Sequence, residues 1–209
     1  MSLTYWEPPS DSLASRVRTV SNQSDSHAHL GLVSCAEPLS ADRCTELCAL
    51  GREYPQERAT VVGEDRLTNH RVGYVHLIPN DSRTHEVYSL LWSVARDAAA
   101  RHYRLAVSGI TRMPHYVEYH AGFGHFHWHD DYSHEREDAP RKLTVVIQLS
   151  DGHDYEGGDF EVFGARVETA PRTLGSIYCL PSFVPHRVTP VTAGVRAVLV
   201  AWIAGPRLV

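Results

Sequence analysis

The chain has 209 residues, of which 43% are hydrophobic and 22% are charged, and its formal net charge is −5. This composition is typical of one globular domain and excludes an intrinsically disordered chain. No long basic run is present to follow a nucleic-acid backbone, and no apolar run approaches the ~20 residues that cross a bilayer.

The first residues, MSLTYWEPPSDSLASRVRTV, lack the apolar core of a secretion signal. The cysteines lack the spacing of a zinc or redox pair, so we expect reduced, mostly buried thiols at Cys35, Cys44, Cys48 and Cys179. The sequence therefore predicts a cytoplasmic protein with no membrane and no nucleic-acid partner. It does not predict an oligomeric state.

The first half of the chain favours helices. Residues 1–36 are rich in Ser, Asp and Pro and predict a poorly packed N-terminal lead. LSADRCTELCALGREY follows, with Ser40 as a helix N-cap, and residues 72–78 predict a short strand. The strongest helical periodicity lies in residues 84–103 and predicts a helix that packs on the core.

After residue 104 the pattern changes to short β-prone runs separated by Gly, Pro and Asp turns. The runs are YRLAVSGI, HYVEYHAG, RKLTVVIQLS, GDFEVFG, RVETA, GSIYCL, HRVTPV and RAVLVAWI. Such a series predicts a β-sandwich or barrel. We therefore expect a mainly β fold in a single domain over residues 37–209, with helical support over about 37–104 and a jelly-roll core over about 105–209.

Three histidines alternate in HFHWHDDY, residues 125–132, and two aspartates follow them. Alternation directs all three imidazoles to one face of an extended strand at the rim of the β core. Imidazoles and carboxylates on a shared face favour either a metal site or a mutually satisfied polar cluster. The spacing alone leaves both open.

Residues farther along the chain favour a metal. A non-haem Fe(II) site needs two imidazoles and one carboxylate on one face of the ion. His129 and Asp131 would supply two ligands from the same side of a strand, and His186 the third. Arg196 opens the last β-prone run, and a guanidinium that faces into a barrel is costly unless it meets an anion.

These motifs together resemble the Fe(II)/2-oxoglutarate-dependent oxygenases, specifically their prolyl 4-hydroxylase-like branch. The resemblance covers roughly residues 113–204 and rests on Tyr119 with Gly122, the HxD of FHWHDD, EGGDF, and the H-x9-R of HRVTPVTAGVR. HxD alone would be weak, but the set in this order is specific. The resemblance implies a double-stranded β-helix.

The resemblance also assigns residues. It implies that His129, Asp131 and His186 are the catalytic iron ligands and that Arg196 binds the distal carboxylate of 2-oxoglutarate. Two further residues are expected to contact this cosubstrate, Tyr119 and Gln148. Gln148 departs from the family pattern, because some relatives have a tyrosine at its position, although an amide could donate the same hydrogen bond.

The implied reaction uses Fe(II), 2-oxoglutarate and O2. It converts 2-oxoglutarate to succinate and CO2 and hydroxylates an unactivated C–H bond. The branch favours an amino acid, a peptidyl residue or an amino-acid-derived small molecule as substrate. Asp131 argues against the halogenating relatives, which leave that ligand position vacant for halide.

Other conspicuous residues have plainer interpretations. His125 and His127 are surplus to a three-ligand site, so we expect them around the ligands or on the surface. Trp202 shares the strand parity of Arg196 and predicts core packing near the cosubstrate. Gly157 and Gly158 predict a tight backbone path between strands.

Three alternatives stay open. A cupin-type metal protein that does not use 2-oxoglutarate would employ the HxH of HFHWH, but it gives no reason for Arg196. A binding module that has lost catalysis would not need the full set of ligands. A nucleic-acid demethylase would need a second arginine in RAVLVAWIAGP, where none is present.

The polar loop at residues 132–140 directly follows Asp131. It is either a plain connection or a mobile lid over the site. Three acidic residues against Arg136 leave this loop a net charge of −2. An acidic lid would attract a substrate that bears a positive nitrogen, such as a basic or free amino acid.

Overall fold

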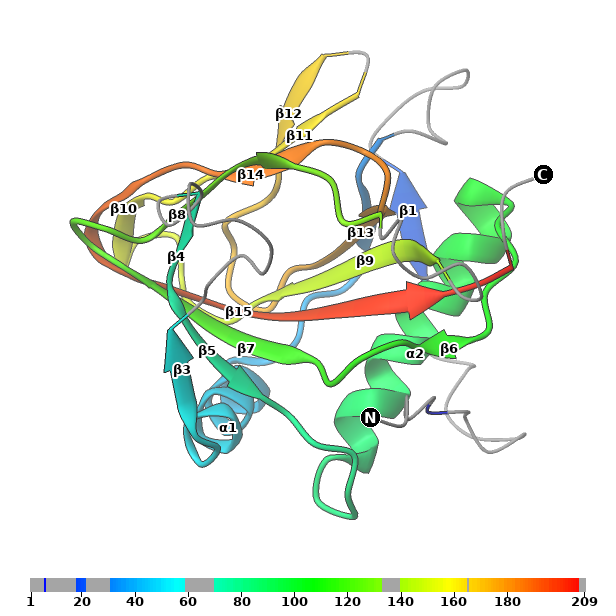
Figure 1. Cartoon of the computed structure of the whole chain (residues 1–209), viewed down its shortest axis with the longest axis horizontal. Coiled ribbons are helices and arrows are strands. Elements are labelled where there is room, and N and C mark those ends of the chain that lie inside the picture. Colours follow the sequence, from blue (N-terminus) through cyan, green and yellow to red (C-terminus); the bar gives the residue numbers. More distant parts are fainter. Residues whose placement is uncertain are drawn as a thin grey trace.

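The computed structural model describes residue 6 and residues 18–21, 31–58, 70–132, 140–164 and 166–206. In this part of the chain two antiparallel sheets face each other, and helices cover the outer face of the larger sheet (Figure 1). The predicted mainly β architecture with supporting helices is confirmed. None of the described helices is long and apolar enough to cross a membrane.

The order of the strands places β15 at the centre of the larger sheet. This order is β1 (Thr19–Ser21), β2 (Val33–Cys35), β13 (Ile177–Pro181), β9 (Arg141–Gln148), β15 (Val191–Ala204), β7 (His115–His120), β5 (Tyr74–Leu77) and β3 (Gln56–Arg58). Two more strands pair with β15, namely β6 (Gly109–Ile110) and β10 (Tyr155–Gly157). The smaller sheet runs in the order β12 (Val167–Thr169), β11 (Phe160–Phe163), β14 (His186–Val188), β8 (His125–His129) and β4 (Arg71–Val72).

Both predicted helices form. In α1 (Ala41–Arg52) the Ser40 hydroxyl accepts a hydrogen bond from the Arg43 backbone N–H, as expected of an N-cap. The second helix, α2 (His85–Ala98), continues as a π-helical turn over Ala99–Tyr103.

Strand β9 shows how the sheet acquires two cores. Leu143, Val145 and Ile147 pack toward the helices, whereas Val146 packs between the two sheets. A strand buried on both faces requires a nearly continuous apolar run, which explains the pattern of RKLTVVIQLS.

Two strand predictions need correction. In YRLAVSGI only the last two residues, Gly109 and Ile110, are β-strand. The chain leaves the π-helical turn through Arg104, at φ 51°, and pairs with β15 only from Gly109 onward. β10 was not predicted, since it is three residues long and pairs with β15 through an irregular register. At its end Gly157 and Gly158 have φ of +66° and +63°, and a Cβ on Gly157 would collide with the Pro190 carbonyl.

The described part of the predicted lead is packed rather than loose. Trp6, Leu32 and Val33 are buried, and β1 and β2 extend the larger sheet. Trp6 and Val33 belong to the core on the helix side of the larger sheet, and Leu32 belongs to the core between the sheets. The rest of the lead lies outside the described residues, and the domain boundary at residue 37 stays a prediction.

Candidate metal centre

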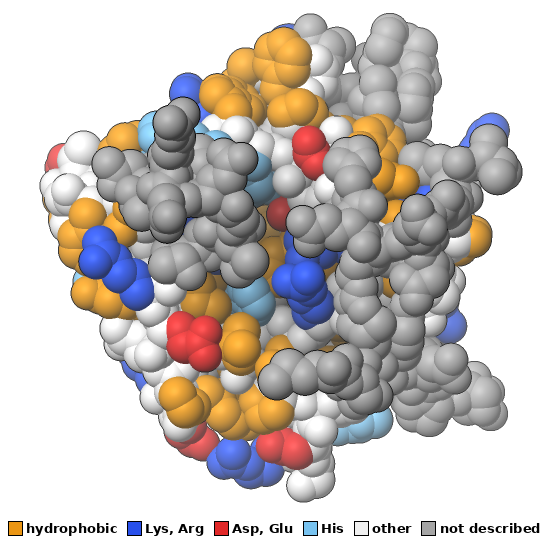
Figure 2. Space-filling view, in the orientation of Figure 1, with side chains coloured by type: hydrophobic (Ala, Val, Ile, Leu, Met, Phe, Trp, Pro, Cys, Tyr) orange, Lys and Arg blue, Asp and Glu red, His pale blue; other side chains and the backbone are white. Residues whose placement is uncertain are grey.

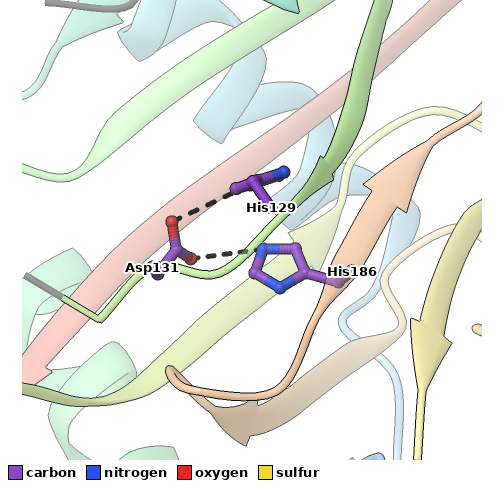
Figure 3. A group of neighbouring side chains, drawn as sticks. All are labelled: His129, Asp131 and His186. Atoms are coloured by element: carbon purple, nitrogen blue, oxygen red, sulfur yellow. Dashed lines mark ion pairs between the residues drawn. The ribbon is translucent and has the colours of Figure 1, made fainter. Parts of the chain in front are cut away.

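Three side chains converge between the two sheets (Figure 3). His129 ends β8, Asp131 lies two residues beyond it, and His186 begins β14 directly opposite His129. The potential ligand atoms of the three all lie within 4.8 Å of one another. The His186 Nε2 lies 3.3 Å from Asp131 Oδ2, and the His129 Nε2 lies 3.9 Å from Asp131 Oδ1.

The backbone fixes both imidazoles in the tautomer that a metal needs. His129 Nδ1 donates to the His127 carbonyl at 2.7 Å, and His186 Nδ1 donates to the Val184 carbonyl at 2.9 Å. In each ring Nε2 is therefore left to face the centre.

The Asp131 carboxylate is buried and held from several sides. The Thr144 hydroxyl donates to Asp131 Oδ2 at 2.8 Å, and the Ser182 hydroxyl lies 3.1 Å from that of Thr144. The Asp131 backbone N–H donates to the Ser182 carbonyl. Burial alone would raise the pKa of Asp131, but His186, His129 and Arg141 hold it well below its usual value. The carboxylate is therefore charged, as a metal ligand must be.

The two imidazoles titrate differently. Burial and the neighbouring His186 lower the pKa of His129 to about 3, so its ring is neutral at physiological pH. Burial would lower the pKa of His186 as well, but the charge and hydrogen bond of Asp131 raise it above its usual value. A metal that binds His186 would therefore compete with a proton more than a metal that binds His129 would.

A bulge in β8 sets His129 apart from His125 and His127, although all three histidines were expected on one face. Two positions of β14, His186 and Val188, stand opposite His129 and Phe126, which are three positions apart. The extra residue breaks the alternation, so both Phe126 and His129 line the cavity, with their rings stacked at 3.4 Å between centroids. His127 is exposed and belongs to none of the described groups of potential metal ligands. The shared-face prediction is wrong because it assumed an unbroken strand.

The centre opens into a cavity between the sheets whose volume is about 30 Å³. Its wall includes all three converging residues and also Tyr119 and Arg196. Figure 2 shows a recess near the middle of this face, with Lys or Arg side chains in blue and histidine in pale blue around it.

Arg196 lies on β15 and is also part of the cavity wall, but it does not belong to the cluster of three converging residues. It is 2% exposed, and its Nη2 donates to the Tyr178 hydroxyl at 2.8 Å. No carboxylate of the described residues lies within ion-pair distance of it, so its charge calls for an anion that the described chain does not supply. Sequence reasoning missed Tyr178, because only the pairing of β13 with β9 and of β9 with β15 brings it beside Arg196.

The two remaining predicted residues differ in position. Tyr119 lines the cavity, and the guanidinium carbon of Arg196 lies 5.9 Å from the centre of its ring. Gln148 is buried but is not part of the cavity wall. Its amide nitrogen already donates to the Ser150 carbonyl and the Tyr155 hydroxyl. The structure therefore brings Tyr119 to the cavity and does not bring Gln148 there.

Comparison with known proteins identifies the family. Residues 114–204 match the sequence profile of the 2OG-Fe(II) oxygenase superfamily. Over these 91 of its 209 residues the chain is similar to this superfamily. The match contains all three converging residues and Arg196, and the family prediction is confirmed.

Curated proteins similar to this chain include PKHD-type hydroxylases. One from Hyphomonas neptunium is 40% identical over 62 residues, and one from Gloeothece citriformis is 47% identical over 62 residues. Each match covers 29% of this chain and only 28% of the relative.

Solved structures share the fold over most of the chain. A Pseudomonas putida prolyl-4-hydroxylase has a TM-score of 0.66 at 20% identity, covering 86% of this chain and 94% of its own. A Trichoplax adhaerens prolyl hydroxylase in complex with a hypoxia inducible factor peptide fragment has a TM-score of 0.67 at 18% identity, covering 83% of each chain. The predicted jelly-roll core of the prolyl 4-hydroxylase type is confirmed.

The family implies Fe(II), 2-oxoglutarate and O2, as predicted, and the side chains fit this set. Two imidazoles in the correct tautomer and one charged carboxylate are the donor set of a non-haem Fe(II) site. A buried arginine without a described carboxylate partner suits a dicarboxylic cosubstrate in the same cavity.

Proposed function

We propose that this oxygenase is an Fe(II)- and 2-oxoglutarate-dependent hydroxylase that releases succinate and CO2. One observation carries the proposal. A single cavity contains a two-histidine, one-carboxylate cluster and, apart from it, a buried arginine with no described carboxylate partner.

In this proposal His129, Asp131 and His186 hold the iron. Bound iron supplies the site at which O2 and 2-oxoglutarate together become an oxidant for a C–H bond. Thr144 keeps one Asp131 oxygen in place through its hydroxyl, and the backbone carbonyls on the two Nδ1 atoms keep both rings in orientation.

Arg196 would bind the distal carboxylate of 2-oxoglutarate. Its fork suits a carboxylate, and the Tyr178 hydroxyl, which it already bonds, could donate to the same anion. Burial raises the pKa of Tyr178 to about 12, so this hydroxyl keeps its proton. The aromatic rings of Tyr119 and Phe160 lie about the guanidinium and exclude water from it.

The substrate in this proposal is an amino acid, a peptidyl residue or a related small molecule. Structures named as prolyl hydroxylases, one of them with a peptide bound, support this class without selecting a member. The expected positive nitrogen rests on residues 132–140, of which 133–139 lie outside the described residues, and it stays a prediction.

A cupin-type protein is not favoured. It would use His127 together with His129, but the bulge in β8 leaves His127 exposed. It would also leave the buried charge of Arg196 without a purpose.

The metal half of the proposal is tested by Fe(II) binding and succinate formation. Replacing His129, Asp131 or His186 singly by Ala should abolish 2-oxoglutarate turnover, because the site has no spare ligand. His127→Ala is the matched control and should bind iron as the native protein does. Loss of iron in His127→Ala, with retention in His129→Ala, would restore the cupin alternative.

The cosubstrate half is tested by the 2-oxoglutarate dissociation constant of the metal-loaded protein. Arg196→Ala should weaken binding by about 2–5 kcal/mol, the usual cost of removing one partner of a buried charge pair. Gln148→Ala should cost no more than the ~1 kcal/mol of a neutral hydrogen bond. Equal affinity in Arg196→Ala and the native protein would remove the argument for this enzyme class.

A further inference from the structure

Two N–H donors in the cavity wall have no hydrogen-bond partner in the part of the chain that the structure describes. The Nε of Arg71 and the Nε1 of Trp202 are both buried, and neither has a hydrogen-bond acceptor among the described residues. Both side chains line the same cavity as the proposed iron ligands. Unsatisfied buried donors are costly, and two that share one cavity indicate a missing acceptor.

The two donors flank the proposed iron ligands. Trp202 pairs across the sheet with Thr144, whose hydroxyl bonds Asp131. Arg71 pairs with Phe126 on β8, and its guanidinium carbon lies 5.0 Å from the centre of the Phe126 ring. That ring in turn stacks on His129. Both donors therefore belong to the part of the cavity where oxidation would occur.

Arg196 marks a different end of the cavity. Trp202 lies six positions after it on β15, which corresponds to roughly 20 Å between their Cα atoms in an extended strand. The cavity thus has a buried arginine, Arg196, for the cosubstrate and a second arginine, Arg71, near the proposed iron. The distal carboxylate of 2-oxoglutarate can occupy only one of them.

The charge around Arg71 is not neutralised by its described neighbours. No carboxylate in the described ranges lies within ion-pair distance of Arg71. Arg141, on the same side, is already placed 3.8 Å from Asp131 and over the Trp202 ring. Burial, followed by the positive charges of Arg71 and Arg141, lowers the pKa of His115 to about 3. Arg71 and Arg141 thus oppose one carboxylate of the described cavity wall, Asp131, and the excess positive charge favours an anion.

We propose that Arg71 and Trp202 form a subsite for a carboxylate of the substrate. The proposal rests on the hydroxylase function above and narrows its substrate to a molecule with a carboxylate near the oxidised carbon, such as a free amino acid or the last residue of a peptide. The guanidinium would supply charge and one N–H, and the indole N–H would bind the second oxygen.

One other ligand of this subsite must be distinguished from a substrate carboxylate. The carboxylate beside the keto group of 2-oxoglutarate could use the same donors, which would make Arg71 part of the cosubstrate site. The first experiment therefore uses protein loaded with Zn(II), a redox-inert substitute for iron, and saturated with 2-oxoglutarate.

In that protein, the Arg71 Nε–H signal is followed by NMR with labelled arginine and identified by its absence in Arg71→Gln. Titration with N-acetylglycine should move this signal, whereas N-acetylglycinamide, which lacks the negative charge, should not. Trp202→Phe retains an aromatic ring, removes the N–H, and should weaken N-acetylglycine binding about 10-fold, as expected for a hydrogen bond to a charged group.

Turnover provides the second readout. Succinate formation is measured with free amino acids and peptides and with their carboxamides. For each stimulating compound, amidation should lower kcat/KM at least 10-fold, and Arg71→Gln should lower it equally for the acid but not for the amide. Arg71→Lys should restore part of the loss. The matched control is Arg112→Gln, which removes an exposed arginine of the same side and should change nothing.

The outcomes are distinct. Absence of succinate formation in both the native protein and Arg112→Gln would refute the hydroxylase, while the NMR titration would still decide the subsite. An Arg71 signal that moves with 2-oxoglutarate and not further with N-acetylglycine would assign Arg71 to the cosubstrate and overturn the inference. Equal binding of acid and amide would also overturn it.

Discussion

Thr144 controls Asp131 through one short hydrogen bond, 2.8 Å from its hydroxyl to Oδ2. Thr144→Val keeps the shape and removes this donor, so we expect metal affinity to fall about 10- to 100-fold, as for other partners of metal ligands. Thr144→Ser retains the hydroxyl and is the control. Metal titration by calorimetry measures both variants, and native affinity in Thr144→Val would show that the bond does not orient the ligand.

His115, which contacts Trp202 in the cavity wall, should make the stability of the protein depend on pH. Its ring lies 4.7 Å from that of Trp202, and its pKa is lowered by burial to about 3 from the usual 6.5. Between about pH 6.5 and 3 the imidazole of His115 is therefore protonated in the unfolded chain and neutral in the folded chain. His115 contributes stability that is complete above about pH 6.5 and is lost as pH falls toward about 3.

His115→Phe removes this proton uptake while it retains an aromatic ring. We expect the variant to lose less unfolding free energy than the native protein between about pH 6.5 and 4, by up to ~1.4 kcal/mol per pH unit. Urea unfolding at several pH values measures the difference. Parallel curves for the two proteins would show that the buried ring does not resist protonation.

At the scale of elements, α1 packs closely against the sheet at a glycine. Gly51 lies in the last turn, and a Cβ there would collide with the ring of Tyr116 on β7. Gly to Ala in a helix normally stabilises by up to ~1 kcal/mol. Here we expect the opposite, a loss of about 1–3 kcal/mol, because the buried Tyr116 has no room to move.

Thermal or urea unfolding of Gly51→Ala checks this sign. The exposed Thr45 on the same helix provides the control, since Thr45→Ala gains helix propensity without touching the sheet. A Gly51→Ala protein as stable as Thr45→Ala would mean that α1 does not press on β7.

At the scale of the molecule, the two cores share their strands. Leu199 on β15 packs toward the helices, whereas Val198 beside it packs between the sheets. The helical layer and the cavity should therefore unfold together, as one domain. Far-UV circular dichroism, tryptophan fluorescence and metal binding should lose their signals at the same urea concentration.

Leu199→Ala probes this coupling from the side away from the cavity. We expect it to cost about 2–5 kcal/mol and to shift all three signals equally, while Leu199→Met costs less than ~1.5 kcal/mol. A separate transition for the helical signal would contradict a single domain.

The sequence alone determined the features that depend on chain order. Alternation and helical periodicity are local, so both helices, the β-rich second half and the Ser40 cap were predictable. The HxD and H-x9-R motifs are likewise defined by spacing along the chain alone. For this reason His129, Asp131, His186 and Arg196 could be singled out before their distances were known.

Tertiary structure decided what depends on strand register. One extra residue in β8 turned His127 away and brought Phe126 against His129, which no alternation rule predicts. The pairing of β13 with β9 and of β9 with β15 placed Tyr178 at Arg196, although nothing along the chain links them. Arg71 has no motif of its own, and only the pairing of β4 with β8 brings it to the cavity. Contacts between distant strands are set by packing of the whole sheet. The residues proposed to bind the substrate could therefore be identified only from the tertiary structure.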